Sequence, residues 1–421
     1  MYRSDRLRAA VRPHEPHTRA GNPRRSNRWF LPAALTLGSV VLLGLLVNHL
    51  RFELRSYALL RRFADPQASG PLLRWETHNV KMEEVTIPLA AGLKTFLEAS
   101  GSDRKSGAGS SSLVRARLYS PVGVKVPGGM VVVHGIHHLG MDEPRLVSFA
   151  RAVAASGLTV LTPQLDSLAE YHVDSSSIAV IGESASWLDE RLGNAGVTVT
   201  GISFAGGLAL FAASDSRYAS HFRALVLVGA YGNLARVSRF LATGLEELPD
   251  GGVETHPPHD YGASVFIYAH LNQFFPPGDL SVAHDALRNW LWEEPEKARA
   301  LLGELSPASR ATMNALLERR IDQVRPHVLN AIHADAVELG ALSPEGQMRN
   351  LRVPVYILHG SADNIIPPAE SLWLKQDLPR QQVRTVLITP AFSHVDFEKD
   401  ASVWEELQLV HFMAAVLETA N

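Results

Sequence analysis

The chain has 421 residues, no cysteine and a formal net charge of -3 at pH 7. This length accommodates one large domain with additions, or two domains. The lack of cysteine excludes disulfide bonds, thiolate metal ligands and a cysteine nucleophile. The nearly balanced charge gives no reason to expect a nucleic-acid partner.

The N-terminal region divides into a basic segment and an apolar one. Residues 1–28 are polar, contain eight arginines and are expected to be disordered. Residues 29–50, WFLPAALTLGSVVLLGLLVNHL, contain no Asp, Glu, Lys or Arg. About 20 apolar residues cross a ~30 Å hydrocarbon layer, and no small-residue cleavage site follows, as it would after a signal peptide. We therefore expect an uncleaved transmembrane helix; a buried helix of a folded domain is the alternative.

The arginines flanking this segment give only a slight topological signal. Within about 20 residues of the segment, five arginines precede it and four follow it. The short basic N-terminus favours a cytoplasmic location for itself, with the rest of the chain on the extracytoplasmic side of a single-pass anchor. Residues 51–78 are expected to form a juxtamembrane helix and a linker, and residues 79–421 one domain.

Strands and helices alternate through most of that domain. Two strands are expected first, around the sequences EEVTIPLA and LVRARLYSPV, separated by a flexible loop at 99–112. Apolar runs that suit buried strands then alternate with helical patterns, which predicts a mostly parallel sheet flanked by helices. The expected buried strands are in the ranges 130–135, 158–165, 197–201, 223–232, 353–363 and 382–389.

This alternation is interrupted at about 232–350, where the pattern is mainly helical. Because the strand–helix rhythm returns afterwards, the segment is an insertion, which we interpret as a helical cap. Its aromatic side chains are expected mostly to fill the cap's own core, with a few lining a cleft between cap and sheet. They are Phe266, Tyr268, Phe274, Phe275, Trp290 and Trp292.

A single serine lies where the expected strand 197–201 meets a helix rich in small residues. The sequence there is GISFAG, residues 201–206. Taken alone, Ser203 could be an ordinary cap at a strand–helix turn. The stretch also resembles the nucleophile elbow of the α/β-hydrolase family, in which a strained turn exposes a serine hydroxyl above the sheet. The second glycine of that motif is replaced by Ala205, which makes the match less specific.

The order of three residues strengthens this resemblance. A serine nucleophile needs a base that is oriented by a third group, and the family's order is serine, acid, histidine. Asp363 follows the buried strand in ILHGSADNIIP, and His394 follows the last expected strand in ITPAFSHVDFE. The resemblance therefore implies a catalytic triad of Ser203, Asp363 and His394.

Acyl transfer also needs hydrogen-bond donors for the developing oxyanion. The resemblance implies the backbone N–H of Phe204, directly after the nucleophile, and that of Ile136, which follows a His-Gly pair. His134 is expected to brace this loop. The neighbouring His137 and His138 are expected to point apart, so we predict no metal site there.

The resemblance implies a serine hydrolase, and we expect it to cleave a small-molecule carboxylic ester through an acyl-enzyme. It does not identify the substrate, because the fold carries many activities. A peptidase or thioesterase that uses the same triad remains an alternative, as does an inactive hydrolase-like binding protein. No glycine-rich phosphate or dinucleotide motif is present in the sequence, so no cofactor is expected.

Overall fold

The computed structural model describes residues 46, 49–89, 113–259, 261–392 and 402–421. The chain divides into two units, residues 1–49 and 50–421. The expected disordered segment 1–28, the loop 99–112 and nearly all of the expected membrane segment 29–50 lie outside the described residues. Among the helices of the described part, none combines the length and the apolar character needed to cross a membrane.

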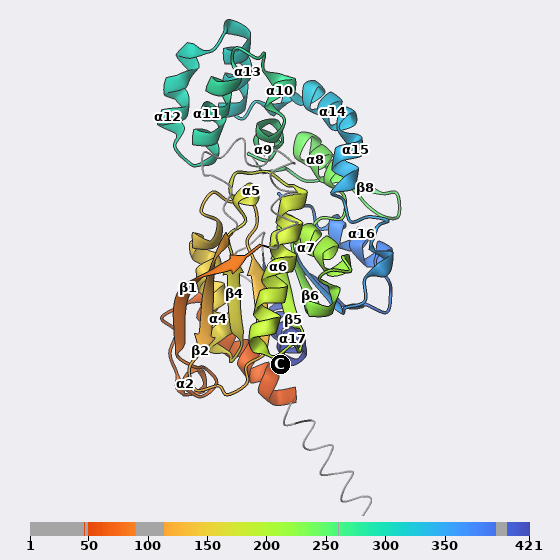
Figure 1. The fold of residues 1–421 in the computed structure, drawn as a ribbon. Coiled ribbons are helices and arrows are strands. Elements are labelled where there is room, and N and C mark those ends of the chain that lie inside the picture. Colours follow the sequence, from red (N-terminus) through yellow and green to blue (C-terminus); the bar gives the residue numbers. More distant parts are fainter. Residues whose placement is uncertain (1–45, 47–48, 90–112, 260, 393–401) are drawn as a thin grey trace, which may run out of the picture. The chain divides into compact units, whose positions relative to one another are not determined.

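Eight strands of the larger unit form one sheet in the order β1-β2-β4-β3-β5-β6-β9-β10 (Figure 1). β2 pairs antiparallel with both β1 and β4, and the remaining neighbours are parallel. This confirms the expected mostly parallel sheet. The strands are β1 (Val80–Pro88), β2 (Leu113–Pro121), β3 (Gly129–Val133), β4 (Thr159–Pro163), β5 (Val197–Ile202), β6 (Phe222–Val228), β9 (Val355–Gly360) and β10 (Val383–Thr389).

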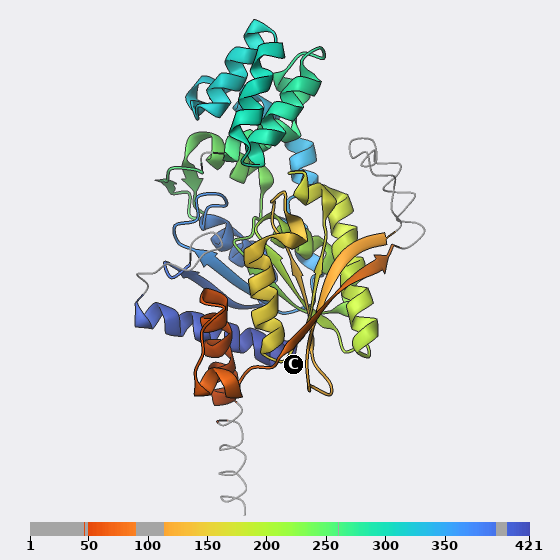
Figure 2. The ribbon, with the colours of Figure 1, turned by 90° about the vertical axis from the view of Figure 1, so that its left-hand side faces the viewer.

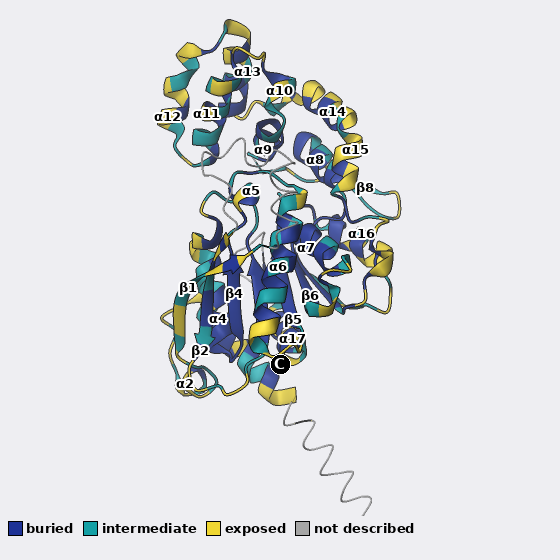
Figure 3. Cartoon of the chain, in the orientation of Figure 1, coloured by how far each residue is buried: buried dark blue, intermediate teal, exposed yellow. Residues whose placement is uncertain are grey.

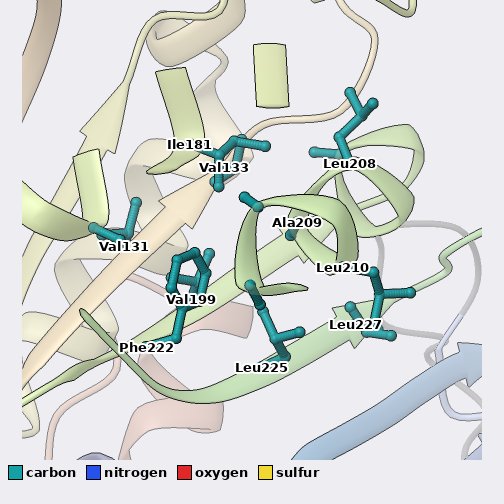
Figure 4. Close-up of a cluster of buried hydrophobic side chains, with 14 of the residues drawn as sticks. Val131, Val133, Ile181, Val199, Leu208, Ala209, Leu210, Phe222, Leu225 and Leu227 are labelled. Atoms are coloured by element: carbon teal, nitrogen blue, oxygen red, sulfur yellow. The ribbon is translucent and has the colours of Figure 1, made fainter. Parts of the chain in front are cut away.

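Helices cover both faces of the sheet because its central strands are apolar on both sides. On one face, Val131 and Val199 belong to a core with α6 (Ser175–Leu192) and α7 (Phe204–Ser214). Figure 4 shows this cluster. The alternate residues Met130 and Val132 belong to a second core with α4 (Pro144–Ala155) and α17 (Val403–Ala420). The period of two along each strand therefore supplies two separate cores.

An N-terminal helix, residues 49–64, packs against α17. Phe52 and Leu59 are buried in the same core as α17. The Ser56 hydroxyl donates to the carbonyl of Val410 over 2.6 Å. Figures 1 and 2 both show this red helix beside the dark-blue α17. The expected juxtamembrane helix is thus a packed part of the larger unit, followed by the short α2 (Pro71–Trp75).

The expected insertion lies between β6 and β9 and is mainly helical. Phe266, Tyr268, Phe274 and Phe275 are buried in a core built mainly by the insertion, as predicted, and the tryptophans pack against it. This core also includes Tyr171, Phe204 and Ile366 of the sheet domain. The outward faces of the insertion's helices are exposed (Figure 3). Its elements are α8 (Leu234–Thr243), β7 (Leu245–Glu247), β8 (Val253–Thr255), α9 (Gly262–Ala269), α10 (Leu271–Phe274), α11 (Leu280–Leu291), α12 (Pro295–Ala300), α13 (Pro307–Leu317), α14 (Arg325–Ala334) and α15 (Ala336–Ala341).

A buried ion pair fastens the start of the cap to α16 (Ala369–Asp377) of the sheet domain. The Glu370 carboxylate accepts hydrogen bonds from the N–H groups of Gly232 and Asn233, over 2.7 and 3.0 Å. The Arg236 guanidinium of α8 donates to both oxygens of Glu370. Glu370 is fully buried, so its charge depends on these partners.

We expect Glu370→Gln to lower the free energy of unfolding by about 3–5 kcal/mol, because it removes the buried carboxylate that pairs with Arg236 and leaves only the partly exposed Glu345 to balance that buried charge. Glu345→Gln is the matched control, since Glu345 also pairs with Arg236 but its side chain is 30% exposed. That control should cost at most about 1 kcal/mol. Urea denaturation measures both variants, and equal losses would contradict this account of the joint.

Candidate active site

The carboxyl ends of the parallel strands bring the expected site residues to one edge of the sheet. Val133 of β3 lies opposite Gly201 of β5, and Ile202 lies opposite Val228 of β6. The last paired residues of β9 and β10 are Gly360 and Thr389. Ser203, the loop after β3 and the loop after β9 therefore start from the same edge, which is where ligands bind in open α/β sheets.

Ser203 has the strained conformation of a nucleophile elbow. Its backbone angles are φ 57° and ψ -130°, and α7 begins at the next residue. A positive φ is uncommon for a residue with a side chain, and such strain gathers at functional sites. The Ser203 N–H donates to the Val228 carbonyl over 2.7 Å, which holds the turn against β6.

Two glycines allow this turn to form. A Cβ on Gly201 would lie 2.6 Å from the Cα of Gly206, and a Cβ on Gly206 would lie 2.4 Å from the Cβ of Ala230. Both distances are far below contact distance, so larger residues would push α7 away from β5. Ala205, where the family motif has glycine, is fully buried and accommodated.

The loop after β3 lies directly against the serine. A Cβ on Gly135 would lie 2.9 Å from the Cβ of Ser203. Among the hydrogen bonds within the described part of the chain, none uses the N–H of Phe204 or Ile136. Phe204 is the first residue of α7, where N–H groups have no partner within the helix and the helix dipole favours negative charge. Both N–H groups are thus available to a ligand at this edge.

His134 holds that loop in place through both ring nitrogens. Its Nε2 accepts from the N–H of Leu165 over 3.0 Å, and its Nδ1 lies 2.7 Å from the Gly135 carbonyl, to which it donates. Burial lowers the pKa of His134 to about 4. The ring is therefore neutral at pH 7 and braces the loop, as the sequence predicted.

We expect the free energy of unfolding to decrease at acid pH, because the buried His134 is hard to protonate in the folded state. Because its pKa in the folded state is below the ordinary 6.5, its stabilising effect is complete above pH 6.5 and is lost as the pH falls toward 4. The loss is about 3 kcal/mol. Urea denaturation measures the free energy of unfolding of the parent and of His134→Gln between pH 7 and 4. The difference between the two proteins should shrink by this amount as the pH falls. A difference that stays constant would contradict this effect of His134.

Asp363 lies in the loop after β9 and is buried. Its Oδ1 accepts from the N–H groups of Ile365 and Ile366, over 2.9 and 3.0 Å. Its Oδ2 lies 3.4 Å from Nε2 of His359. His359, which no sequence motif marks, is fully buried and also contacts Ser371 over 2.6 Å. These contacts fix the carboxylate at the edge that carries Ser203.

The third expected catalytic residue, His394, lies outside the described residues. The structure describes the chain as far as Phe392, three residues beyond the end of β10 at Thr389. The contact between base and acid therefore stays a prediction, as does the catalytic role of His394.

An apolar cavity of about 130 Å³ opens beside Ser203. Its walls come from the sheet, the loop after β3, α4, α17, the helix 49–64 and Phe392 after β10. Among its described lining residues, Tyr261 is the contribution of the cap. A few of the six aromatic cap residues identified in the sequence were expected to line a cleft between cap and sheet, but none of the six is among the described residues that line this cavity. In the sequence, the amphipathic pattern of residues 52–63 indicates that this helix buries one side. The pattern does not show that the buried side lines the cavity beside Ser203.

The paired histidines differ from expectation. The rings of His137 and His138 do not point apart but stack, with centroids 4.7 Å apart. The ring of His138 also stacks on Trp292 of the cap at 5.5 Å. Adjacent side chains tend to point in different directions along the backbone. Here the stacking of His138 on Trp292 of the cap outweighs that tendency.

The comparisons with known proteins concern the fold. No protein-family model matches the sequence, and no curated protein matches it. A rice cell wall degrading esterase, LipA from Xanthomonas oryzae, has 12% identity, with 82% of this chain and 91% of that chain covered and a TM-score of 0.45. A 2-hydroxy-6-oxo-6-phenylhexa-2,4-dienoate hydrolase from a Rhodococcus species has 13% identity, coverages of 78% and 97%, and a TM-score of 0.38.

An acylaminoacyl peptidase from Pyrococcus horikoshii has 12% identity and a TM-score of 0.42; the match covers 81% of this chain and 41% of the peptidase. Because these TM-scores are low, the fold is assigned from the geometry of the chain itself. That geometry comprises a mostly parallel sheet covered on both faces, the strained turn at Ser203 and a buried acid in the loop after β9. By these features the chain has the α/β-hydrolase fold.

Proposed function

We propose that the protein is a serine hydrolase that cleaves carboxylic esters of small molecules. The observation that carries this proposal is the strained Ser203, which lines an apolar cavity and lies against the loop of Gly135. A strained residue persists only where the surrounding structure enforces it, and such positions gather at active sites. The cavity favours a substrate with an apolar part.

In the proposed reaction, the Ser203 hydroxyl attacks the ester carbonyl and passes its proton to His394. Asp363 orients the imidazole and stabilises its charged form. The N–H groups of Phe204 and Ile136 stabilise the oxyanion, and the alcohol leaves with the proton held by His394. Water, deprotonated by His394, then hydrolyses the acyl-enzyme and restores the serine. This scheme needs no cofactor or metal.

A fluorophosphonate probe and a set of substrates test the proposal. The probe should label Ser203, and p-nitrophenyl esters should be hydrolysed faster than thioesters or aminoacyl amides of the same acyl group. Preference for the amides or thioesters would favour the peptidase or thioesterase alternative. A protein that neither reacts with the probe nor turns over any of these substrates would be the inactive binding protein.

We further propose that residues 29–50 anchor the protein as a single membrane pass, with the hydrolase on the extracytoplasmic side. The apolar length of this segment and its basic flank support the proposal. The full chain should require detergent, whereas a shortened chain beginning at residue 49, which keeps the packed helix, should remain in the supernatant without it. A full chain that also needs no detergent would contradict the anchor.

Protease accessibility tests the proposed orientation separately. Protease added to spheroplasts should degrade the hydrolase domain. If the domain is protected in spheroplasts but degraded in inverted vesicles, the orientation is the reverse.

A further inference from the structure

The cavity beside Ser203 reaches a part of the chain that is distant from the serine in sequence. Sheet residues Met130, Thr200 and Leu358 line it, and they lie on the face that packs against α4 and α17. Leu60 and Phe63 of the helix 49–64 also line it. The space beside the serine therefore lies among residues of the core between the sheet and its helices.

Apart from the hydroxyls of Ser203 and Tyr261, most polar groups in this wall have a partner within the protein. The Thr200 hydroxyl lies 3.4 Å from the sulfur of Met130, and both nitrogens of His134 have partners. Glu143 and Arg145 pair with each other over 2.7 Å. An apolar space with no free polar group among these residues suits a hydrocarbon chain, because a bound polar group would lose its hydrogen bonds to water.

This space lies beside the strained Ser203 and is lined mainly by apolar side chains. Binding sites for small molecules are concave, mostly apolar and largely pre-formed, so its position and character suit a ligand. An engineered apolar cavity of ~150 Å³ holds a benzene molecule, so about six carbons would fill the 130 Å³ here.

We infer that this cavity receives the acyl chain of the ester, and that Leu60 and Phe63 of the N-terminal helix limit the length of that chain. The inference rests on the proposed function and adds the substrate class, esters of short to medium acyl chains. It also assigns the helix 49–64 a part in substrate selection. Phe63 meets Phe149 of α4 edge to face at 5.3 Å, and both rings line the cavity.

Fluorophosphonates with linear alkyl chains of rising length test this inference on the full chain in detergent. The rate of labelling at Ser203 should rise up to about six carbons, by at most roughly fourfold for each buried methylene, and then fall. Phe63→Ala should move the optimum to chains at least about two carbons longer, since a ring-sized space is added and partly collapses. Phe63→Leu and Leu60→Ala should cause smaller shifts in the same direction.

Phe52→Ala is the matched control. Phe52 is a buried phenylalanine of the same helix but is not among the residues lining the cavity. Its loss should leave the preferred chain length unchanged. If all variants are labelled but keep the parent optimum, or if Phe52→Ala causes the same shift as Phe63→Ala, the inference is wrong while the proposed function stands. If no probe labels Ser203 even in the parent, the proposed function itself fails.

Esters that vary the alcohol test which part of the substrate enters the cavity. In acyl p-nitrophenyl esters, Phe63→Ala should move the chain-length optimum of kcat/KM as it does for the probes. In acetate esters of linear alcohols, the same variant should leave the profile unchanged. A shift confined to the alcohol series would overturn the assignment of the cavity to the acyl chain.

Discussion

Replacing Ser203 by alanine should lower kcat for ester hydrolysis by about 10⁶-fold and should abolish labelling by a fluorophosphonate. The hydroxyl is the only group removed, and in the proposed mechanism it forms the covalent bond to the acyl group. Alanine keeps the Cβ that lies against Gly135, so the turn and the cavity remain. Initial rates and intact-protein mass spectrometry after probe treatment measure the two effects.

Ser177→Ala is the matched control for this substitution. Ser177 is a buried serine of α6 whose hydroxyl has no hydrogen-bond partner among the described residues. Its removal should therefore leave both kcat and labelling unchanged. If Ser203→Ala retained the parent rate with every ester, another residue would be the nucleophile and the proposed mechanism would be wrong.

Asp363→Asn should lower kcat by about 10⁴-fold with a small effect on KM, because an amide no longer stabilises the charged imidazole and favours the wrong tautomer. The asparagine oxygen can still accept the N–H groups of Ile365 and Ile366, so the loop should keep its conformation. Steady-state kinetics measures kcat and KM. The loss should persist at every pH at which the protein is folded.

Asp279→Asn in the cap provides the comparison. Asp279 is also a buried aspartate, and its carboxylate accepts from the hydroxyls of Ser306 and Ser309. Its replacement should lower the free energy of unfolding but leave kcat intact. His394→Ala should lose as much activity as Asp363→Asn or more. A normal rate in His394→Ala would place the catalytic base elsewhere in the chain.

The sequence by itself determined the fold class and the position of the strained turn. Buried parallel strands are apolar on both faces, so they stand out as short continuous runs between helical patterns. The glycines around Ser203 also indicate the turn from the sequence alone, because only small residues permit such a close approach of strand and helix. The cap's aromatic core could also be anticipated, since large apolar side chains in a helical insertion pack first against one another.

Only the tertiary structure decided which residues surround the serine. The approach of Gly135 to Ser203 depends on the order of β3 and β5 in the sheet, which local patterns do not specify. The cavity depends on how α4, α17 and the helix 49–64 pack against one face of that sheet. Leu60 and Phe63 are more than 130 residues from Ser203 in sequence, and an amphipathic pattern shows that a helix buries one side without showing against what. Hydrophobic contact is not directional, so the partner is chosen by the shape of the folded chain.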